Sequence, residues 1–248
     1  MQRPKEEHGL VSETLFGVRN KVQEAIDLFK KHEPPEGYYL AFSGGKDSVC
    51  IYWIAKMAGV TFDAHYNLTT VDPPELVRFI KTFPDVQINH PEKTMWELIV
   101  HKVMPPTRMV RYCCKSLKEG YGNGRVVVTG VRADESRKRK DRGEFYKFKS
   151  KQFLNPIYFW TEEDVWDYIE KNNLAYCSLY DEPGLSRLGC IMCPVGNIKK
   201  RMAEAERYPK FKAAYLRTFG RMIQERNRRG MDTKWKSSQE VMDWWLSQ

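Results

Sequence analysis

Residues 43 to 48 read Ser-Gly-Gly-Lys-Asp-Ser and combine the residue types of an anion-binding turn. An apolar run at 38–42 precedes the turn and is typical of a buried strand, while the apolar residues after it repeat at helical spacing. Glycines let a ligand approach the backbone closely, and a helix N-terminus favours phosphate. We therefore expect a nucleotide phosphate to bind Ser43, Gly44, Gly45, Lys46, Asp47 and Ser48.

The turn lacks the G-x-x-x-x-G-K-[ST] spacing of a Walker A loop. It is similar instead to the pyrophosphate loop of the adenine nucleotide alpha-hydrolase superfamily, whose members cleave ATP between its alpha and beta phosphates. That resemblance implies ATP with Mg²⁺ as the ligand. Lys46 would offset the charge that develops on the departing pyrophosphate, and Asp47 would help to hold Mg²⁺, a cation that prefers oxygen ligands.

Four of the six cysteines form two close pairs in the sequence. Cys113 and Cys114 are adjacent, and Cys190 and Cys193 form a C-x-x-C. Four thiolates in two pairs can surround a zinc ion or an iron–sulfur cluster. An adjacent pair is unusual for structural zinc, where two to four residues normally separate neighbouring ligands. The pattern therefore predicts a metal centre and favours iron–sulfur, with zinc as the alternative.

The order of these cysteines resembles the [4Fe–4S] pattern of the phosphoadenosine phosphosulfate (PAPS) reductase family, especially its adenylyl-sulfate reductases. Three further motifs match that family in order: an acidic turn at 71–75, a phosphate loop of the form G-x-R-x-x-E-S-x-x-R at 130–139, and an N-P-I…W-T…D-V-W signature at 155–166. The resemblance implies a cluster on the four paired cysteines. It also implies nucleotide or metal contacts by Asp72, and nucleotide contacts by Gly130, Arg132, Glu135 and Ser136, with Arg132 and Arg139 clamping phosphates or the acceptor.

Two departures from the reductases favour a branch of the family that uses ATP. The reductases carry a catalytic cysteine in a C-terminal tail, but no cysteine follows Cys193 here, and the pyrophosphate loop is intact with both Lys46 and Asp47. The chain thus resembles iron–sulfur proteins of DNA phosphorothioation. This implies cleavage of ATP to AMP and pyrophosphate, which activates an acceptor for sulfur transfer, and a cysteine desulfurase or another sulfur donor as partner.

Two alternatives remain open at this point. The first is a PAPS or adenylyl-sulfate reductase that forms sulfite, in which Cys177 would replace the missing nucleophile, because Cys50 lies on an apolar helix face and is expected to be inert. The second is a module that binds DNA or tRNA around a degenerate nucleotide site. Residues 132–151 are rich in Lys and Arg and interleave them with aromatic residues, as base-stacking surfaces do, although a solvated loop or a lid over phosphates would look similar.

The bulk properties fit one α/β domain with helical additions. The chain has 248 residues, is 42% hydrophobic, and carries a formal net charge of +9, which suits polyanionic partners such as nucleotides or nucleic acid. Nothing in it resembles a secretory signal or a long apolar span, so we expect a reducing cytoplasmic location, thiols in place of disulfides, and no membrane partner.

Alternating apolar runs predict strands at 38–42, 61–68, 86–90 and 125–131, and helices at 46–58, 73–82, 94–103 and 162–172. This alternation predicts a doubly wound, mostly parallel, Rossmann-like sheet with its ligand site at the carboxyl ends of the strands. The expected organisation is an N-terminal helical extension (1–36), a nucleotide-binding domain with the cysteines (37–196), and a helical region (197–248). In the extension, Val18, Val22, Ile26 and Phe29 predict one helix that packs on the domain or forms a homodimer contact.

Overall fold

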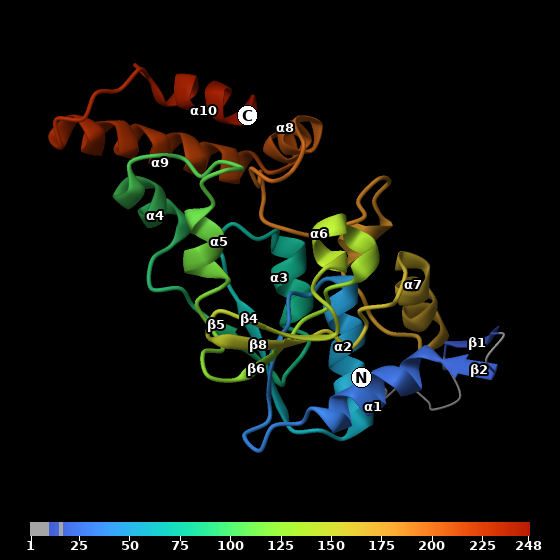
Figure 1. The fold of residues 1–248 in the computed structure, drawn as a ribbon. Helices are drawn as coiled ribbons and strands as arrows, with labels where there is room; N and C mark the ends of the chain where they lie inside the picture. The colour runs from blue at the N-terminus through green and yellow to red at the C-terminus, as the bar shows by residue number, and fades with distance from the viewer. Residues whose placement is uncertain (1–9, 15–16) are drawn as a thin grey trace. The chain divides into compact units, whose positions relative to one another are not determined.

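A computed structural model describes residues 10–14 and 17–248, so residues 1–9 and 15–16 of the expected extension lie outside the described residues. The chain divides into two compact units, each assembled from separate stretches of sequence (Figure 1). The first unit contains Met1–Asn67, Glu75–Asn89 and Gly122–Leu188. The second contains Leu68–Pro74, His90–Tyr121 and Gly189–Gln248. The compact units therefore cut across the three consecutive segments expected from the sequence.

The first unit is built on a six-stranded sheet in the order β5-β4-β3-β6-β8-β7. Every neighbouring pair is parallel except the antiparallel β7–β8 hairpin, which confirms the predicted mostly parallel α/β fold. The strands are β3 (Tyr38–Ala41), β4 (Phe62–Asn67), β5 (Val86–Asn89), β6 (Val126–Val128), β7 (Phe145–Phe148) and β8 (Lys151–Leu154).

Strand β3 lies at the centre of the sheet and marks the point where the strand order changes direction. It pairs with β4 on one side and with β6 on the other, and Leu40 is opposite both Ala64 and Val128. In open parallel sheets, ligands bind outside the carboxyl ends of the strands at such a switch point. The turns that follow β3 and β6 are therefore the positions where the fold itself favours a ligand.

Helix α2 (Lys46–Ala58) follows β3 and is buried over most of its length. It begins after Gly45 and ends at Gly59, whose left-handed backbone (φ 69°) terminates the helix without steric cost. Helix α3 (Pro74–Ile80) and helix α7 (Glu162–Lys171) follow later strands. At the start of α7 the Thr161 and Asp164 side chains form the reciprocal capping box that their spacing predicts.

Helix α1 (Lys21–Lys31) buries Val22, Ala25, Ile26 and Phe29 and packs against α2. The expectation that Val18 belongs to this helix is wrong, because β2 (Gly17–Asn20) pairs with β1 (Val11–Thr14) in a separate hairpin. The Asn20 backbone is extended, and its side chain accepts hydrogen bonds from the N–H groups of Val22 and Gln23. This N-cap fixes the helix start at Lys21.

The basic segment at 132–151 is not an open loop. It forms a short 3₁₀ turn at Ala133–Glu135, helix α6 (Arg137–Lys140) and strand β7, which pairs with β8 at the edge of the sheet. Another 3₁₀ turn, Ser178–Asp181, follows α7. The sequence left open a solvated loop or a lid over phosphates, whereas the structure has a paired hairpin at this position.

The second unit is helical. Its helices are α4 (Met95–Lys102), α5 (Tyr112–Leu117), α8 (Ile198–Arg207), α9 (Pro209–Arg228) and α10 (Ser238–Leu246). Tyr215, Phe219 and Trp245 are buried at its centre, and α9 packs against both α4 and α10. The predicted helical region at 197–248 thus shares one core with the segment at 90–121. Within the described part of the chain, no helix combines the length and apolar character needed to cross a membrane.

Candidate functional site

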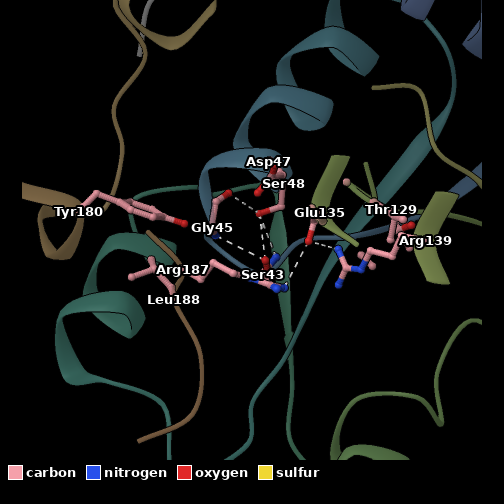
Figure 2. A pocket seen from close by; sticks show the side chains of 13 residues that line it. Ser43, Gly45, Asp47, Ser48, Thr129, Glu135, Arg139, Tyr180, Arg187 and Leu188 are labelled. Carbon is pink, nitrogen blue, oxygen red and sulfur yellow. Dashed lines mark hydrogen bonds and ion pairs between the residues drawn. The ribbon is translucent and has the colours of Figure 1, made fainter. Parts of the chain in front are cut away.

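A pocket of about 220 Å³ lies in the first unit at the carboxyl ends of β3 and β6 (Figure 2). The sequence predicted seven of its lining residues: Ser43, Gly45, Asp47, Ser48, Gly130, Glu135 and Arg139. Six more line it without having been assigned a role: Ala41, Thr129, Val131, Tyr180, Arg187 and Leu188. Thr129 and Val131 flank Gly130 in the phosphate-loop motif, whereas no sequence signal identifies Tyr180.

Other predicted residues do not line this pocket. Gly44, Lys46, Arg132 and Ser136 belong to the two motifs, but they are not among the residues that face the cavity. Asp72 belongs to the second unit, where it is 6% exposed and its carboxylate accepts a hydrogen bond of 2.7 Å from the Thr69 N–H.

The turn after β3 is shaped by its own residues. Gly44 has a φ of 71°, and a Cβ there would lie 2.7 Å from side-chain carbons of both Leu76 and Ile80. The Ser48 hydroxyl donates to the Gly45 carbonyl at 2.8 Å and accepts from the Ser43 N–H at 3.2 Å. The turn is thus held in place by α3 on one side and by the first turn of α2 on the other.

Gly130 lets the loop after β6 approach the start of α2. A Cβ at this position would lie 2.8 Å from the Asp47 Cβ and 3.0 Å from the Asp47 carbonyl carbon. Backbone atoms cannot move aside as the end of a flexible side chain can, so only glycine fits here. This contact brings the two predicted phosphate loops together as opposite walls of one pocket.

Arg132 lies behind the pocket wall and holds Asp47. Its Nε donates to Asp47 Oδ1 at 2.6 Å, and its Nη1 donates to the Trp160 carbonyl at 3.4 Å. The arginine is 4% exposed, whereas the Asp47 side chain is 26% exposed and lines the pocket. Arg132 therefore fixes the direction of the carboxylate.

Lys46 extends toward the chain at 162–186 and not into the pocket. Its Nζ donates to the Ser186 carbonyl at 2.6 Å, pairs with Glu162 at 3.0 Å, and lies over the rings of Trp166 and Tyr180. Its backbone N–H donates to the Tyr180 hydroxyl at 3.1 Å. Tyr180 therefore occupies a helix N-terminal N–H, which is the kind of group that binds phosphate.

Two arginines converge on one carboxylate at the opposite wall. Arg139 from α6 forms an ion pair with Glu135, and Arg187 lies 3.4 Å from the same Glu135 oxygen (Figure 2). The Glu135 side chain is 9% exposed, whereas that of Arg187 is 66% exposed. Because one acid is shared by two guanidinium groups, this wall of the pocket carries an excess of positive charge.

All four paired cysteines lie in the second unit. Cys113 and Cys114 belong to α5, and Cys190 and Cys193 lie in the turn before α8. The Cys113 thiol donates to Cys114, which lowers the pKa of the Cys114 thiol to about 6, while this hydrogen bond, burial and the charges of Cys114, Cys190 and Cys193 raise the pKa of Cys113. The four sulfurs therefore interact electrostatically as one group.

The turn at Cys190 is held from two sides. The Ile191 N–H donates to the Val71 carbonyl at 2.8 Å, and the Met192 N–H donates to Glu204 of α8 at 2.6 Å. Met192 itself has a φ of 55°, and the Cys193 N–H closes the turn on the Cys190 carbonyl. In the described residues, no three His, Cys, Asp or Glu side chains come close enough to hold a single metal ion.

The remaining two cysteines belong to the first unit and are fully buried. Cys50 packs on α2 with its thiol 3.8 Å from the Val165 carbonyl, and burial raises its pKa, as expected for an inert thiol. Cys177 is also 0% exposed, and burial raises its pKa as well. Neither residue has the exposure or the lowered pKa of a reactive cysteine.

Comparison with known proteins gives consistent matches. The phosphoadenosine phosphosulfate reductase domain model matches residues 37–196. An adenosine 5'-phosphosulfate reductase of Staphylococcus haemolyticus is 36% identical over 40% of this chain and 43% of its own, and a probable FAD synthase of Schizosaccharomyces pombe is 28% identical over 73% and 71%. The crystal structure of a PAPS reductase from Candida auris aligns with a TM-score of 0.52 at 16% identity, covering 67% of this chain and 88% of that one.

The structural match shows only that the two proteins share a fold, because their sequence identity is 16%. The matches cover 43 or 44% of the length of three of these curated relatives.

The close approach at Gly130 leads to a first prediction. Gly130→Ala should separate the two pocket walls and weaken the binding of Mg-ATP by about tenfold or more, a loss of about 1.4 kcal/mol. Isothermal titration calorimetry measures this, with circular dichroism to confirm that the variant is folded. Gly220→Ala in α9 is the control, because an added Cβ there meets only a Ser238 carbon at 4.0 Å. Unchanged ATP binding by Gly130→Ala would contradict the assignment of this contact.

Proposed function

Because this chain belongs to the phosphoadenosine phosphosulfate reductase family, we propose that it cleaves ATP to AMP and pyrophosphate and thereby activates an acceptor for sulfur transfer. The observation that carries the proposal is the intact turn at 43–48, whose Ser43, Asp47 and Ser48 line the pocket opposite Gly130. A substrate that is already adenylylated needs no site for a leaving pyrophosphate, whereas ATP does.

The pocket supports a triphosphate through groups on both walls. The turn after β3 offers two serine hydroxyls, together with the N–H groups at the start of α2 other than that of Lys46, which Tyr180 occupies. The opposite wall offers Arg139 and Arg187, and guanidinium groups bind phosphate oxygens in pairs. A chain of three phosphates would therefore meet donors or positive charge along its whole length.

Asp47 is the proposed ligand for Mg²⁺. Arg132 holds its Oδ1 atom, and the Oδ2 atom would remain to bind the cation. The lining hydroxyls of Ser43 and Ser48 are also oxygen donors, so the chemistry of the donor set fits magnesium. The metal would neutralise charge on the phosphate oxygens, and Arg132 would keep the carboxylate in place.

The proposed first step is an in-line displacement at the alpha phosphorus. An acceptor oxygen forms a bond to that phosphorus, and the bond from phosphorus to the oxygen that bridges to the beta phosphate breaks. Pyrophosphate leaves with both bonding electrons, and its new charge faces the helix N-terminus and the arginines. In the second step a sulfur nucleophile displaces AMP from the acceptor. Lys46 would stabilise the leaving pyrophosphate only after it exchanged Glu162 and Ser186 for phosphate oxygens.

The four paired cysteines are the proposed ligands of a [4Fe–4S] cluster, which would supply a site for binding sulfide. Four thiols of one unit, whose charges act on one another, provide the thiolate donor set that such a cluster would need.

Buried Arg201 supports an anionic centre near these cysteines. It is 0% exposed and donates to the Trp245 and Gln248 carbonyls at 2.7 and 3.1 Å; burial lowers its pKa, and the charges of Cys193, Tyr215 and Glu204 oppose that shift. A buried cation bonded to neutral carbonyls is costly unless negative charge lies nearby. A thiolate cluster would provide that charge.

Asp47 provides the main test of the proposal. Calorimetric titration of anaerobically purified protein should show that Mg-ATP binds at least about tenfold more tightly than PAPS or adenylyl sulfate, and that Asp47→Asn removes most of this preference because the metal loses its ligand. Asp167→Asn, an exposed substitution on α7, is the matched control. Tighter binding of either sulfonucleotide would refute the ATP assignment and favour a reductase.

The reductase alternative has its own support, since relatives of this chain carry the name adenosine 5'-phosphosulfate reductase. It requires a thiol nucleophile, and Cys177 is fully buried. We expect no sulfite when the protein is incubated with adenylyl sulfate and a dithiol reductant. If sulfite does form, and Cys177→Ser abolishes it, the ATP-cleaving proposal is wrong and Cys177 is the nucleophile.

The metal centre can be tested without an activity assay. The anaerobic protein should be brown and contain about four iron atoms per chain. Cys114→Ser should lose most of the iron and the visible absorption, because each cysteine would bind one iron. Cys50→Ala should keep both, since Cys50 lies in the other unit. A colourless protein with one zinc per chain would contradict the cluster.

A further inference from the structure

The positive charge of this protein is concentrated in one short stretch. Residues 136–151 contain eight Lys or Arg and two Asp or Glu, whereas the whole chain has 41 Lys or Arg and 32 Asp or Glu. Six of the nine excess positive charges therefore lie within sixteen residues. All of these residues belong to the first unit, in α6, β7, the start of β8 and the turns between them.

The nucleotide pocket accounts for only one of these cations. Arg139 pairs with Glu135 and lines the pocket. Six others are exposed, and no ion pair joins them to any acid in the described part of the chain: Arg137, Lys138, Lys140, Arg142, Lys147 and Lys149. A group of exposed like charges repels itself, so it is expected to bind a polyanion larger than the nucleotide.

An aromatic side chain lies among these cations. Phe148, at the end of β7, is 58% exposed, and the Lys149 Nζ lies 5.4 Å from the centre of its ring. The other two aromatic residues of β7 are already stacked, Phe145 on His32 and Tyr146 on Phe153. An exposed ring beside lysines is the arrangement on which unpaired bases stack. We name Phe148 and the six cations above the α6–β7 surface.

The α6–β7 surface is fixed to the sheet. Strand β7 pairs with β8 from Phe145↔Leu154 to Phe148↔Lys151. The buried Asn155 side chain donates to the Gly143 carbonyl at 2.9 Å, and the Tyr158 hydroxyl donates to the Lys140 carbonyl at 2.6 Å. Because the backbone is held in this way, the cations are presented in a defined order, and less conformational entropy is lost on binding.

The same short helix belongs to both the surface and the pocket. Arg139 of α6 lines the pocket, whereas its neighbours Lys138 and Lys140 are exposed. We propose that the acceptor of the reaction is a nucleic acid with unpaired bases, held by the α6–β7 surface so that one nucleotide reaches the pocket. The role of this nucleic acid as acceptor rests on the proposed function. Binding of nucleic acid to the α6–β7 surface does not require ATP cleavage.

Lysines on an edge strand can also serve only to prevent aggregation, and β7 is an edge strand. The two roles differ in what the lysines bind. Edge protection requires no partner and gives no preference for nucleic acid. A binding surface gives affinity that falls steeply with salt, and it loses affinity when the ring of Phe148 is removed.

The test is fluorescence anisotropy of the full chain with labelled single-stranded DNA and RNA of about 20 nucleotides and mixed sequence, at several salt concentrations. Replacement of Lys138, Lys140 and Lys147 by Glu should weaken binding at least about tenfold and reduce the salt dependence. The control replaces Lys30, Lys31 and Lys81, three exposed lysines elsewhere in the first unit, by Glu. It changes the net charge equally and should change binding less than about twofold.

Phe148→Ala should weaken single-strand binding at least about fivefold and duplex binding much less, because only unpaired bases stack on the ring. Equal losses in the control triple variant, or no loss in the surface variants, would overturn the inference. If heparin displaced the labelled strand as well as an unlabelled single strand of equal charge does, the surface would be a general polyanion site. That result would also overturn the inference. Mg-ATP titrations of each variant keep the two proposals separate, since failure to bind ATP with intact nucleic-acid binding refutes only the proposed function.

Discussion

The contact between Gly130 and the start of α2 is the constraint on which the nucleotide pocket depends. It exists because β3 and β6 are neighbours at the point where the strand order changes direction, and because position 130 has no Cβ. Because the two loops lie this close, Arg132 donates a hydrogen bond to the Asp47 carboxylate, and Arg139 lines the same cavity as Asp47. The donors of two motifs that lie more than eighty residues apart in sequence are thereby combined into one site.

The pocket and the paired cysteines lie in separate compact units. The pocket residues all belong to the first unit, whereas the four paired cysteines belong to the second. The second unit draws on three stretches of sequence, and its core joins α4 with α9 and α10 around Tyr215, Phe219 and Trp245. The cysteine turn is held by Val71 and Glu204, which come from two of these stretches. Its geometry therefore depends on the whole unit being folded.

The charged side chains of the first unit fall into a paired group and an unpaired group. Acidic partners are placed where a cation must be oriented, as Glu162 is beside Lys46 and Glu135 is between Arg139 and Arg187. Along α6 and β7 the cations other than Arg139 form no ion pair in the described residues, and residues 136–151 carry most of the net charge of the protein. Paired charges fix geometry, whereas unpaired charges attract a polyanion from solution.

The sequence by itself determined most of the fold. Apolar periodicity located β3, β4, β5, β6, α2, α3, α4 and α7, because this signal acts within a few residues. In the structure, capping boxes of Thr94 with Glu97 and of Thr161 with Asp164 begin α4 and α7. It also located the glycine turn and most of the polar lining of the pocket.

The sequence missed β7 and β8, whose side chains are largely half-buried or exposed, so that no alternation of burial marks them. It missed Tyr180, and it did not foresee that Lys46 would bind Glu162 and Ser186, more than a hundred residues away. Only tertiary structure decided these partners, because the packing of distant segments, and not local residue preference, sets which polar groups meet.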